Sequence, residues 1–412
     1  MLQDWSDTLR SDAFAQLARH PSHPRAFTRR RALPLSTLVA TLLCMRGASQ
    51  QALVDKVFTA LSADAQPVCG VSDRAFAKAR SHLHVPAVTA LNDDLLARAE
   101  AAGLLPRWQG LRLVAADASV LMPAIRRCPR TRGLAQADQR LFALYLPGAE
   151  LTLHAEICPA TESERSMLAN ALDKLGPSDV LLLDRGYPAA WLVNLLQERG
   201  IRFIMRCDTS SGGWTALRRF IQGSAPEAHI TLSAPQPQDA ADWQCSPQAP
   251  TVRVVRQIAP NGQTRVLMTN LTAAQAPAHC FGGLYHQRWR IEEAFKRLKH
   301  RLHLESVSGL SQHALMIDVA AKILADNLAA LLARAAHEAA GASPNRPCNL
   351  AYTLTVLQRI TPRLLAFAGE IGTLIESALT AIARTIKRRK PHRSAPRQHA
   401  KVKPHPSAAY KG

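Results

Sequence analysis

Apolar residues recur at three- and four-residue spacing from about Asp12 to Leu96, which predicts a helical region. After Pro106 the pattern changes to short apolar runs that alternate with helical stretches, as expected of an α/β unit. The helical pattern returns from Gly283 and continues, with interruptions, to about Arg384. We therefore expect a helical N-terminal domain, an α/β core and a helical C-terminal region.

The α/β part of the sequence predicts a specific order of elements. The expected strands are 111–116, 140–145, 151–157, 180–183 and 201–205, and the expected helices are 162–175 and 188–199. Pro147-Gly148 suits a hairpin turn between the second and third strands. The continuous apolar run at 180–183 is typical of a buried central strand. Three strands, a helix, a strand, a helix and a strand is the order of an RNase H-like core.

A stretch rich in Pro, Gln, Ser and Gly follows, with strand-like runs at 229–232, 251–255 and 264–268. We interpret it as a β-rich insertion. The expected division is a helical N-terminal domain with a role in DNA binding at 1–105, the RNase H-like core at 106–206 and 281–312, the insertion at 207–280, a helical C-terminal region at 313–384 and a basic tail at 385–412. Residues 387–412 contain nine Lys or Arg and no acid, which favours a disordered tail that attracts phosphates nonspecifically.

The net charge of +20 and the pI near 10.3 indicate a broad positive field and therefore a polyanionic partner, either nucleic acid or an anionic membrane. No membrane span is expected, because the most apolar stretch, 314–333, is interrupted by Asp318, Lys322 and Asp326. Basic clusters at 25–31 and 74–80 favour contact with DNA phosphates. The start of the chain has no secretory signal, so we expect a cytoplasmic, nucleoid-associated protein.

The eight cysteines are scattered, with no CxxC pair and no histidine at zinc-ligand spacing. We expect reduced thiols rather than disulfides or a zinc site.

Three acidic residues stand out as candidate ligands. Asp117 and Asp184 follow apolar runs that the RNase H-like order places side by side, and Glu292 lies on a predicted helix at 285–299. At about 100° per residue, Tyr285, Arg288, Glu292 and Lys299 share one face of that helix, apart from its apolar face. Clustered carboxylates repel one another unless cations compensate them, and oxygen ligands select Mg²⁺ or Mn²⁺. Taken alone, the helix could equally carry a simple Arg288–Glu292 surface ion pair.

The spacing Tyr285-x2-Arg288-x3-Glu292-x6-Lys299, with the motif Asp184-Arg-Gly-Tyr187, resembles the signatures of bacterial insertion-sequence transposases of the family-four type. The resemblance implies that Asp117, Asp184 and Glu292 are catalytic metal ligands. It also implies that Tyr285, Arg288 and Lys299 bind the transposon end near the scissile phosphate. Such enzymes cut both strands, commonly through a hairpin, and join the 3′ ends to target DNA within a synaptic homodimer.

Some assignments remain open at the level of sequence. Ala118 stands where many relatives carry glycine, and Asp138 is a second candidate for the first aspartate. Glu293 lies about 100° around the helix from Glu292 and is the weaker candidate ligand. The remaining side chains of interest are Glu162 and Glu164, which suit the start of their own helix, and Trp214, Trp243 and Trp289, which suit either packing or stacking on an extruded base.

Two other functions compete with the transposase interpretation. An RNase H-like nuclease or resolvase would cleave DNA without joining it, and a catalytically silent relative would only bind DNA. The insertion and the Tyr-Arg-Glu-Lys spacing argue against the first, and the presence of all three acids argues against the second.

Overall fold

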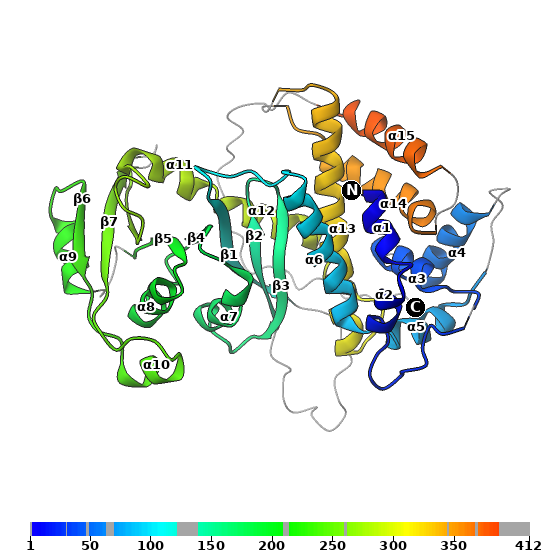
Figure 1. The fold of residues 1–412 in the computed structure, drawn as a ribbon, viewed down its shortest axis with the longest axis horizontal. Helices are drawn as coiled ribbons and strands as arrows, with labels where there is room; N and C mark the ends of the chain where they lie inside the picture. The colour runs from blue at the N-terminus through cyan, green and yellow to red at the C-terminus, as the bar shows by residue number, and fades with distance from the viewer. Residues whose placement is uncertain are drawn as a thin grey trace, which may run out of the picture. The chain divides into compact units, whose positions relative to one another are not determined.

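The computed structural model describes residues 2–386, except for 30, 47–48, 63–69, 122–138, 209–213, 259–261, 344–345 and 367–369. The chain divides into two compact units (Figure 1). The helical unit consists of Met1–Leu104, Leu121–Gln136 and Lys296–Gly412, and the sheet unit consists of Leu105–Val120 and Ala137–Phe295. Each unit is described by itself.

The helical unit is built around one long helix, α13, which packs against α3, α5, α6, α14 and α15. Its helices are α1 (Leu2–Thr8), α2 (Asp12–Leu17), α3 (Leu35–Leu43), α4 (Gln50–Leu61), α5 (Asp73–Ser81), α6 (Val85–Ala101), α13 (Gln312–Ala339), α14 (Leu350–Ala366) and α15 (Ile371–Ala383). Ser11, Ser72 and Ser311 begin three of them, because each side-chain oxygen accepts a backbone N–H of the first turn. The apolar faces of these helices form the core of the unit.

Helix α13 carries buried charges that have partners inside the helical unit. The Ser308 hydroxyl donates to Asp318 at 2.6 Å, and Arg297 pairs with Asp326 at 2.7 Å. Lys322 donates to two backbone carbonyls. These contacts explain how an apolar helix tolerates three charges in a protein core. In the part of the chain that the structure describes, no helix meets the length and apolarity needed to cross a membrane.

The sheet unit contains one mixed sheet of eight strands in the order β3-β2-β1-β4-β5-β8-β7-β6 (Figure 1). The strands are β1 (Arg112–Leu121), β2 (Gln139–Leu146), β3 (Leu151–Pro159), β4 (Asp179–Leu183), β5 (Arg202–Arg206), β6 (Glu227–Thr231), β7 (Thr251–Ile258) and β8 (Thr264–Thr269). β4 pairs in parallel with both β1 and β5, whereas β2 and β3 form an antiparallel hairpin. Every residue of β4 is buried, as its apolar sequence predicts. This arrangement fits an RNase H-like core.

The segment interpreted as an insertion contributes strands to the same sheet. β8 pairs with the core strand β5, and β7 and β6 follow in antiparallel order. The sequence predicts these strands but not their partner, because a pattern of apolar residues does not show which strand pairs with β5.

The helices of the sheet unit contact individual strands of the sheet. They are α7 (Glu164–Asn170), α8 (Ala190–Glu198), α9 (Thr215–Gln222), α10 (Pro237–Asp242), α11 (Phe281–His286) and α12 (Trp289–Arg301), with short 3₁₀ helices η2 (Leu172–Lys174) and η3 (Ala278–Cys280). α7 contacts β2, α8 contacts β5, α9 contacts β6 and α11 contacts β7. α12 begins in the sheet unit and ends in the helical unit.

Two local expectations need correction. β1 does not end before Asp117 but continues to Leu121, beyond the end of its partner β4. The single helix expected at 285–299 is divided between α11 and α12. The turn between them is at Gln287 and Arg288, whose backbone N–H groups donate to the carbonyls three residues earlier in the chain, as in a 3₁₀ helix.

The described cysteines form no disulfide bonds, in agreement with their scattered spacing: Cys44, Cys158, Cys207, Cys245, Cys280 and Cys348 are free. Cys69, Cys128, Asp138 and the tail from 387 onward lie outside the described residues.

Candidate active site

Strands β1 and β4 bring Asp117 and Asp184 to one place in the sheet unit. Their parallel register pairs Ala115 with Leu182. Asp117 and Asp184 each follow two residues later along the chain, and the charge of Asp184 helps to raise the pKa of Asp117. Asp184 directly follows the last residue of β4, so its side chain is at the carboxyl end of a buried strand. Ligand-binding residues of parallel sheets commonly occupy this position.

The loop after β4 fixes the direction of the Asp184 carboxylate. The Gly186 N–H donates to Asp184 Oδ1 at 2.7 Å, and Arg165 Nε donates to the Gly186 carbonyl at 2.9 Å. A Cβ atom at position 186 would lie 3.1 Å from Asp184 Oδ1 and 3.7 Å from Glu164 Oε2. A larger residue here would therefore push the Asp184 carboxylate aside, and the Asp184 and Glu164 carboxylates border the same methyl-sized space.

Arg288 connects the aspartate on β1 to the glutamate on α12. Its Nη1 lies 3.5 Å from Asp117 Oδ2 and its Nη2 donates to Glu292 Oε1 at 2.7 Å. Burial alone would lower the pKa of Arg288, which is only 7% exposed, but Tyr285, Asp117, Glu292 and Asp184 together raise it. The guanidinium is thus a permanent positive charge between two of the proposed ligands.

Burial, more than the neighbouring charges, makes the ionised form of Asp117 costly. The pKa of Asp117 is raised to about 7, chiefly by burial and then by Glu164 and Asp184, although Arg288 and the Ala118 N–H act in the opposite direction. Burial and Asp184 likewise raise the pKa of Glu164. The cluster consequently favours any further cation that can approach it.

Two tyrosines lie beside these charges. Tyr187 is fully buried, and its hydroxyl has no hydrogen-bond partner among the described residues. Burial raises its pKa well above the usual value, and Glu164, Asp117 and Asp184 raise it further, so the phenol lies near all three carboxylates. Tyr285 is 3% exposed and hydrogen-bonds to Arg288; burial also raises its pKa.

The proposed site residues do not all fall into one cluster. Asp117, Asp184, Tyr285 and Arg288 interact within the sheet unit, and Glu292 joins them through Arg288. Lys299 lies further along α12, in the helical unit, with its Nζ 3.8 Å from Glu305 Oε1.

The chemical type of the candidate ligands suits a hard divalent cation, because Asp117, Asp184 and Glu292 have carboxylate oxygens. As arranged here, no three His, Cys, Asp or Glu side chains of the described ranges are positioned to hold a metal ion together. Glu292 instead accepts a hydrogen bond from the Arg288 guanidinium.

Sequence reasoning missed the position of Glu164. It is the first residue of α7, whose N-cap Ser163 accepts the Ser166 N–H, and this agrees with the expected role at a helix start. Its carboxylate also faces the aspartates, with Arg140 Nη1 at 3.7 Å from Oε1. No spacing in the sequence signals this, since only the fold of α7 against β2 brings Glu164 to the site.

The remaining acidic and aromatic candidates occupy different environments. Glu162 accepts a hydrogen bond from Asn170 at 3.2 Å, and Glu293 is exposed on α12. Trp243 stacks on Trp191 at 4.8 Å with an interplanar angle of 6°, which is a packing role. Trp289 is 37% exposed.

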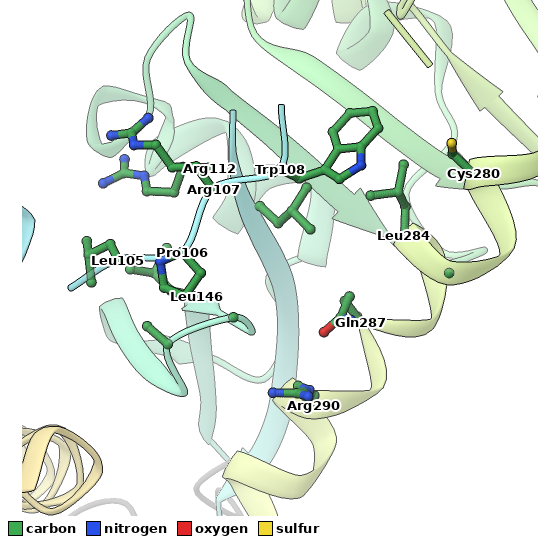
Figure 2. A pocket seen from close by; sticks show the side chains of 14 residues that line it. Leu105, Pro106, Arg107, Trp108, Arg112, Leu146, Cys280, Leu284, Gln287 and Arg290 are labelled. Atoms are coloured by element: carbon green, nitrogen blue, oxygen red, sulfur yellow. The ribbon is translucent and has the colours of Figure 1, made fainter. Parts of the chain in front are cut away.

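A separate cavity of about 530 Å³ lies within the sheet unit (Figure 2). Its wall includes Trp108, Arg112, Leu284 and Arg290, and none of the three candidate metal ligands lines it. Two of the arginines already have partners, since Arg112 pairs with Asp179 and Arg290 donates to the Pro147 carbonyl.

Comparison with known protein families gives a match over part of the chain. Residues 124–328 match the family described as the transposase DDE domain. The matched range includes Asp184 and Glu292 and begins after Asp117. No curated protein matches the sequence. A cryo-EM structure of the piggyBac transposase synaptic complex with hairpin DNA aligns at 12% identity and a TM-score of 0.42, covering 95% of this chain and 83% of that one, a similarity too low to assign fold or activity.

Proposed function

From the transposase DDE domain that residues 124–328 carry, we propose that this chain cleaves DNA at insertion-sequence ends and joins the ends to target DNA. The observation that supports this most directly is that Asp117 of β1 and Asp184, directly after the neighbouring parallel strand β4, lie near enough for the charge of Asp184 to raise the pKa of Asp117. Arg288 links this pair to Glu292, which completes the set of three acids.

In this proposal Asp117, Asp184 and Glu292 are the catalytic residues that hold Mg²⁺ or Mn²⁺. When bound, such ions stabilise the attacking and leaving oxygens of a phosphodiester. The protein would then orient the scissile phosphate with positively charged side chains and the Tyr285 hydroxyl. Arg288 is the positive charge nearest to the acids, and Lys299 lies on α12 about two turns after Glu292.

The partners that we propose are the terminal inverted repeats, the target DNA and a second copy of this chain in the synaptic complex. The net charge of +20 supports a DNA partner, because neutralising backbone phosphates is the main source of nonspecific DNA affinity. A hairpin intermediate belongs to the same proposal and rests on the sequence signature alone.

The test uses the DNA that flanks this reading frame, as a linear fragment carrying its terminal repeats. We expect cleavage at the repeat ends that requires Mg²⁺ or Mn²⁺, followed by joined products when target DNA is added. Asp117→Asn, Asp184→Asn and Glu292→Gln should each abolish cleavage while retaining DNA binding in a mobility-shift assay. Glu293→Gln is the matched control, because its side chain is exposed one position away.

The same assay separates the competing functions. Cleavage without joined products would indicate a nuclease, and binding without cleavage would indicate a silent relative. Full cleavage by any one of the three variants would remove that residue from the site. Hairpin ends on the excised fragment would support the hairpin route, and their absence in a time course would reject it.

A further inference from the structure

Five histidine side chains gather at one place in the helical unit, and backbone pairing brings four of them together. The segment after α2 runs antiparallel to the segment after α5. The His20 N–H donates to the His82 carbonyl, and the His84 N–H donates to the Ala18 carbonyl, each at 2.9 Å. The chain then turns, and the His23 N–H donates to the His20 carbonyl at 2.7 Å. This arrangement keeps His23 beside the paired segments.

The imidazole rings of this group lie close to one another. The ring centroids of His23 and His82 are 3.9 Å apart, with 31° between the ring planes. The His20 centroid lies 6.0 Å from that of His23 and 6.1 Å from that of His84. His313, in the first turn of α13, is the fifth member, with its centroid 5.3 Å from that of His20. We call these five residues the histidine cluster; in the described part of the chain they are not placed to hold a metal ion.

The charges around His82 are basic. Burial lowers the pKa of His82, and the charges of His23, Lys78, Arg31 and His20 lower it further. Lys78, Arg31 and His23 are exposed, so the same charges also face the solvent. Protonated imidazoles repel one another and these cations, and a bound anion would remove the repulsion.

The side of the cluster formed by α13 has the same sign of charge. Burial and then His20 lower the pKa of His313, and the charge of Arg80 acts in the same direction, although hydrogen bonds to the backbone oppose them. The Nε2 atom of His313 is buried and has no hydrogen-bond partner among the described residues. The carboxylate that Arg80 affects is Asp318, which is buried and accepts the Ser308 hydroxyl at 2.6 Å. This carboxylate is therefore engaged in the protein core.

We propose that the histidine cluster, together with Arg31 and Lys78, binds the phosphate backbone of duplex DNA, and that protonation of its imidazoles strengthens the binding. No carboxylate is among the described groups that shift the pKa of its two perturbed histidines. Protonated imidazoles donate charge-assisted hydrogen bonds to phosphate oxygens. The net charge of +20 and the exposed Arg25 and Arg29 favour a long polyanion over a small one. The inference rests on the DNA partner in the proposed function and adds that the helical unit takes up protons when it binds DNA.

The experiment measures filter binding of the full chain to a labelled DNA duplex at constant ionic strength, without divalent ions, at pH 6 and pH 8. The parent should bind at least tenfold more tightly at pH 6, because histidines gain charge between these pH values. The double variant His23→Gln/His82→Gln should lose most of this difference. Its salt dependence at pH 6 should be shallower by about 0.9 in log–log slope for each histidine that no longer neutralises a phosphate.

Two further variants test whether the effect belongs to the cluster. The segment 387–412 contains three other histidines, His392, His399 and His405, and replacing all three with Gln should leave the difference between pH 6 and pH 8 unchanged. His23→Lys places a fixed positive charge in the cluster. This variant should bind DNA several-fold more tightly than the parent at pH 8 and show a smaller difference between the two pH values. Loss of folding does not produce such a gain.

Thermal unfolding without DNA separates phosphate binding from a purely structural role. Because the pKa of His82 lies below the ordinary value of 6.5, the folded protein disfavours its charged form, and this stabilisation is lost as pH falls. The double variant should therefore unfold no earlier than the parent at pH 6.

Three results would overturn this inference: equal DNA affinity of the parent at pH 6 and pH 8, a parental pH difference in the double variant, or its loss in the variant of segment 387–412. None of them affects the cleavage assay, which decides the proposed function independently.

Discussion

At the scale of single residues, Arg288 has two opposing effects on the site. Its guanidinium stabilises Asp117 and Glu292 as anions, and it lies 2.7 Å from one proposed ligand. A divalent ion that approaches this ligand is repelled by the guanidinium and competes with it. The release of Glu292 therefore requires Arg288 to move, and a DNA phosphate is a suitable replacement partner for it.

This competition predicts that removing the Arg288 charge strengthens the binding of a divalent ion. Arg288→Gln should bind Mn²⁺ more tightly than the parent in the absence of DNA, by a factor of about 10, which corresponds to roughly 1.4 kcal/mol of removed repulsion. The same variant should cleave end DNA poorly, because it lacks the phosphate-binding charge. Isothermal titration at pH 8 measures the first effect, and the fragment assay measures the second.

Arg290→Gln serves as the control for net charge. Arg290 is two residues away, yet it donates to the Pro147 carbonyl and lies near Glu150 rather than the acidic cluster. Its Mn²⁺ affinity should match that of the parent. Unchanged or weaker binding by Arg288→Gln would show that the guanidinium does not compete with the cation.

The raised pKa of Asp117 links the site to stability. Because its folded value of about 7 exceeds the ordinary value of 3.8, the folded protein binds the proton more tightly than the unfolded chain does. The stabilisation by this proton is complete below pH 3.8 and is lost as pH rises through about 7. At pH 8 the ionised carboxylate thus costs at most about 4 kcal/mol.

Asp117→Asn should therefore stabilise the metal-free protein at pH 8, by about 1 to 2 kcal/mol once the missing pairing with Arg288 is deducted. The advantage should shrink as pH falls from 7 toward 4, where the parent takes up its proton. Thermal unfolding at several pH values measures this. A variant that is less stable than the parent at pH 8 would contradict the cost of ionising the buried Asp117 carboxylate.

At the scale of elements, the apolar residues of the strands that carry or precede the aspartates were sufficient to predict both strands, although β1 continues past Asp117 to Leu121. The sequence also predicted the acidic helix, but not its interruption at Gln287 and Arg288. That turn involves no proline or glycine, so composition gives no sign of it. The interruption matters because it leaves Tyr285 and Arg288 outside α12, both of them buried.

The position of Glu164 was beyond sequence reasoning for a different reason. A glutamate at the first position of a helix is common on electrostatic grounds alone, so its presence there carries no functional information. Its approach to Asp184 depends on how α7 packs on β2, a long-range contact. The pairing of β8 with β5 is long-range in the same way.

Within the sheet unit, Trp191 of α8 stacks on Trp243, the residue that directly follows α10, and this contact packs the two helices together. Trp243→Ala should lower the unfolding free energy of this unit by about 1 to 3 kcal/mol, because the variant buries less apolar surface and has no ring to stack. Trp214→Ala, at the start of α9, is the aromatic control and should cost less. Thermal unfolding monitored by circular dichroism gives both values.

A different outcome would revive the base-stacking interpretation of Trp243. In that case Trp243→Ala would leave stability unchanged and reduce only the yield of hairpin ends. The stacking of the two rings predicts instead that Trp243→Ala lowers the stability of the sheet unit.

At the scale of the whole molecule, positive charge is distributed unevenly along the chain. Residues 387–412 contain nine Lys or Arg and no acid, against a net charge of +20 for the entire protein. The acidic site lies in the sheet unit, which contains no residue of this segment. Affinity for DNA and catalysis should therefore respond separately to removal of the segment.

Deletion of 387–412 should weaken nonspecific DNA binding and reduce the steepness of its salt dependence, by about 0.9 in log–log slope for each phosphate that is no longer neutralised. Replacing the nine basic residues with Gln in the full-length chain should reproduce the effect, which distinguishes charge from chain length. Filter binding between low and moderate salt measures the slope, and cleavage at saturating protein should persist in both variants. An unchanged slope would mean that the DNA phosphates are neutralised elsewhere, with the basic clusters at 25–31 and 74–80 as the next candidates.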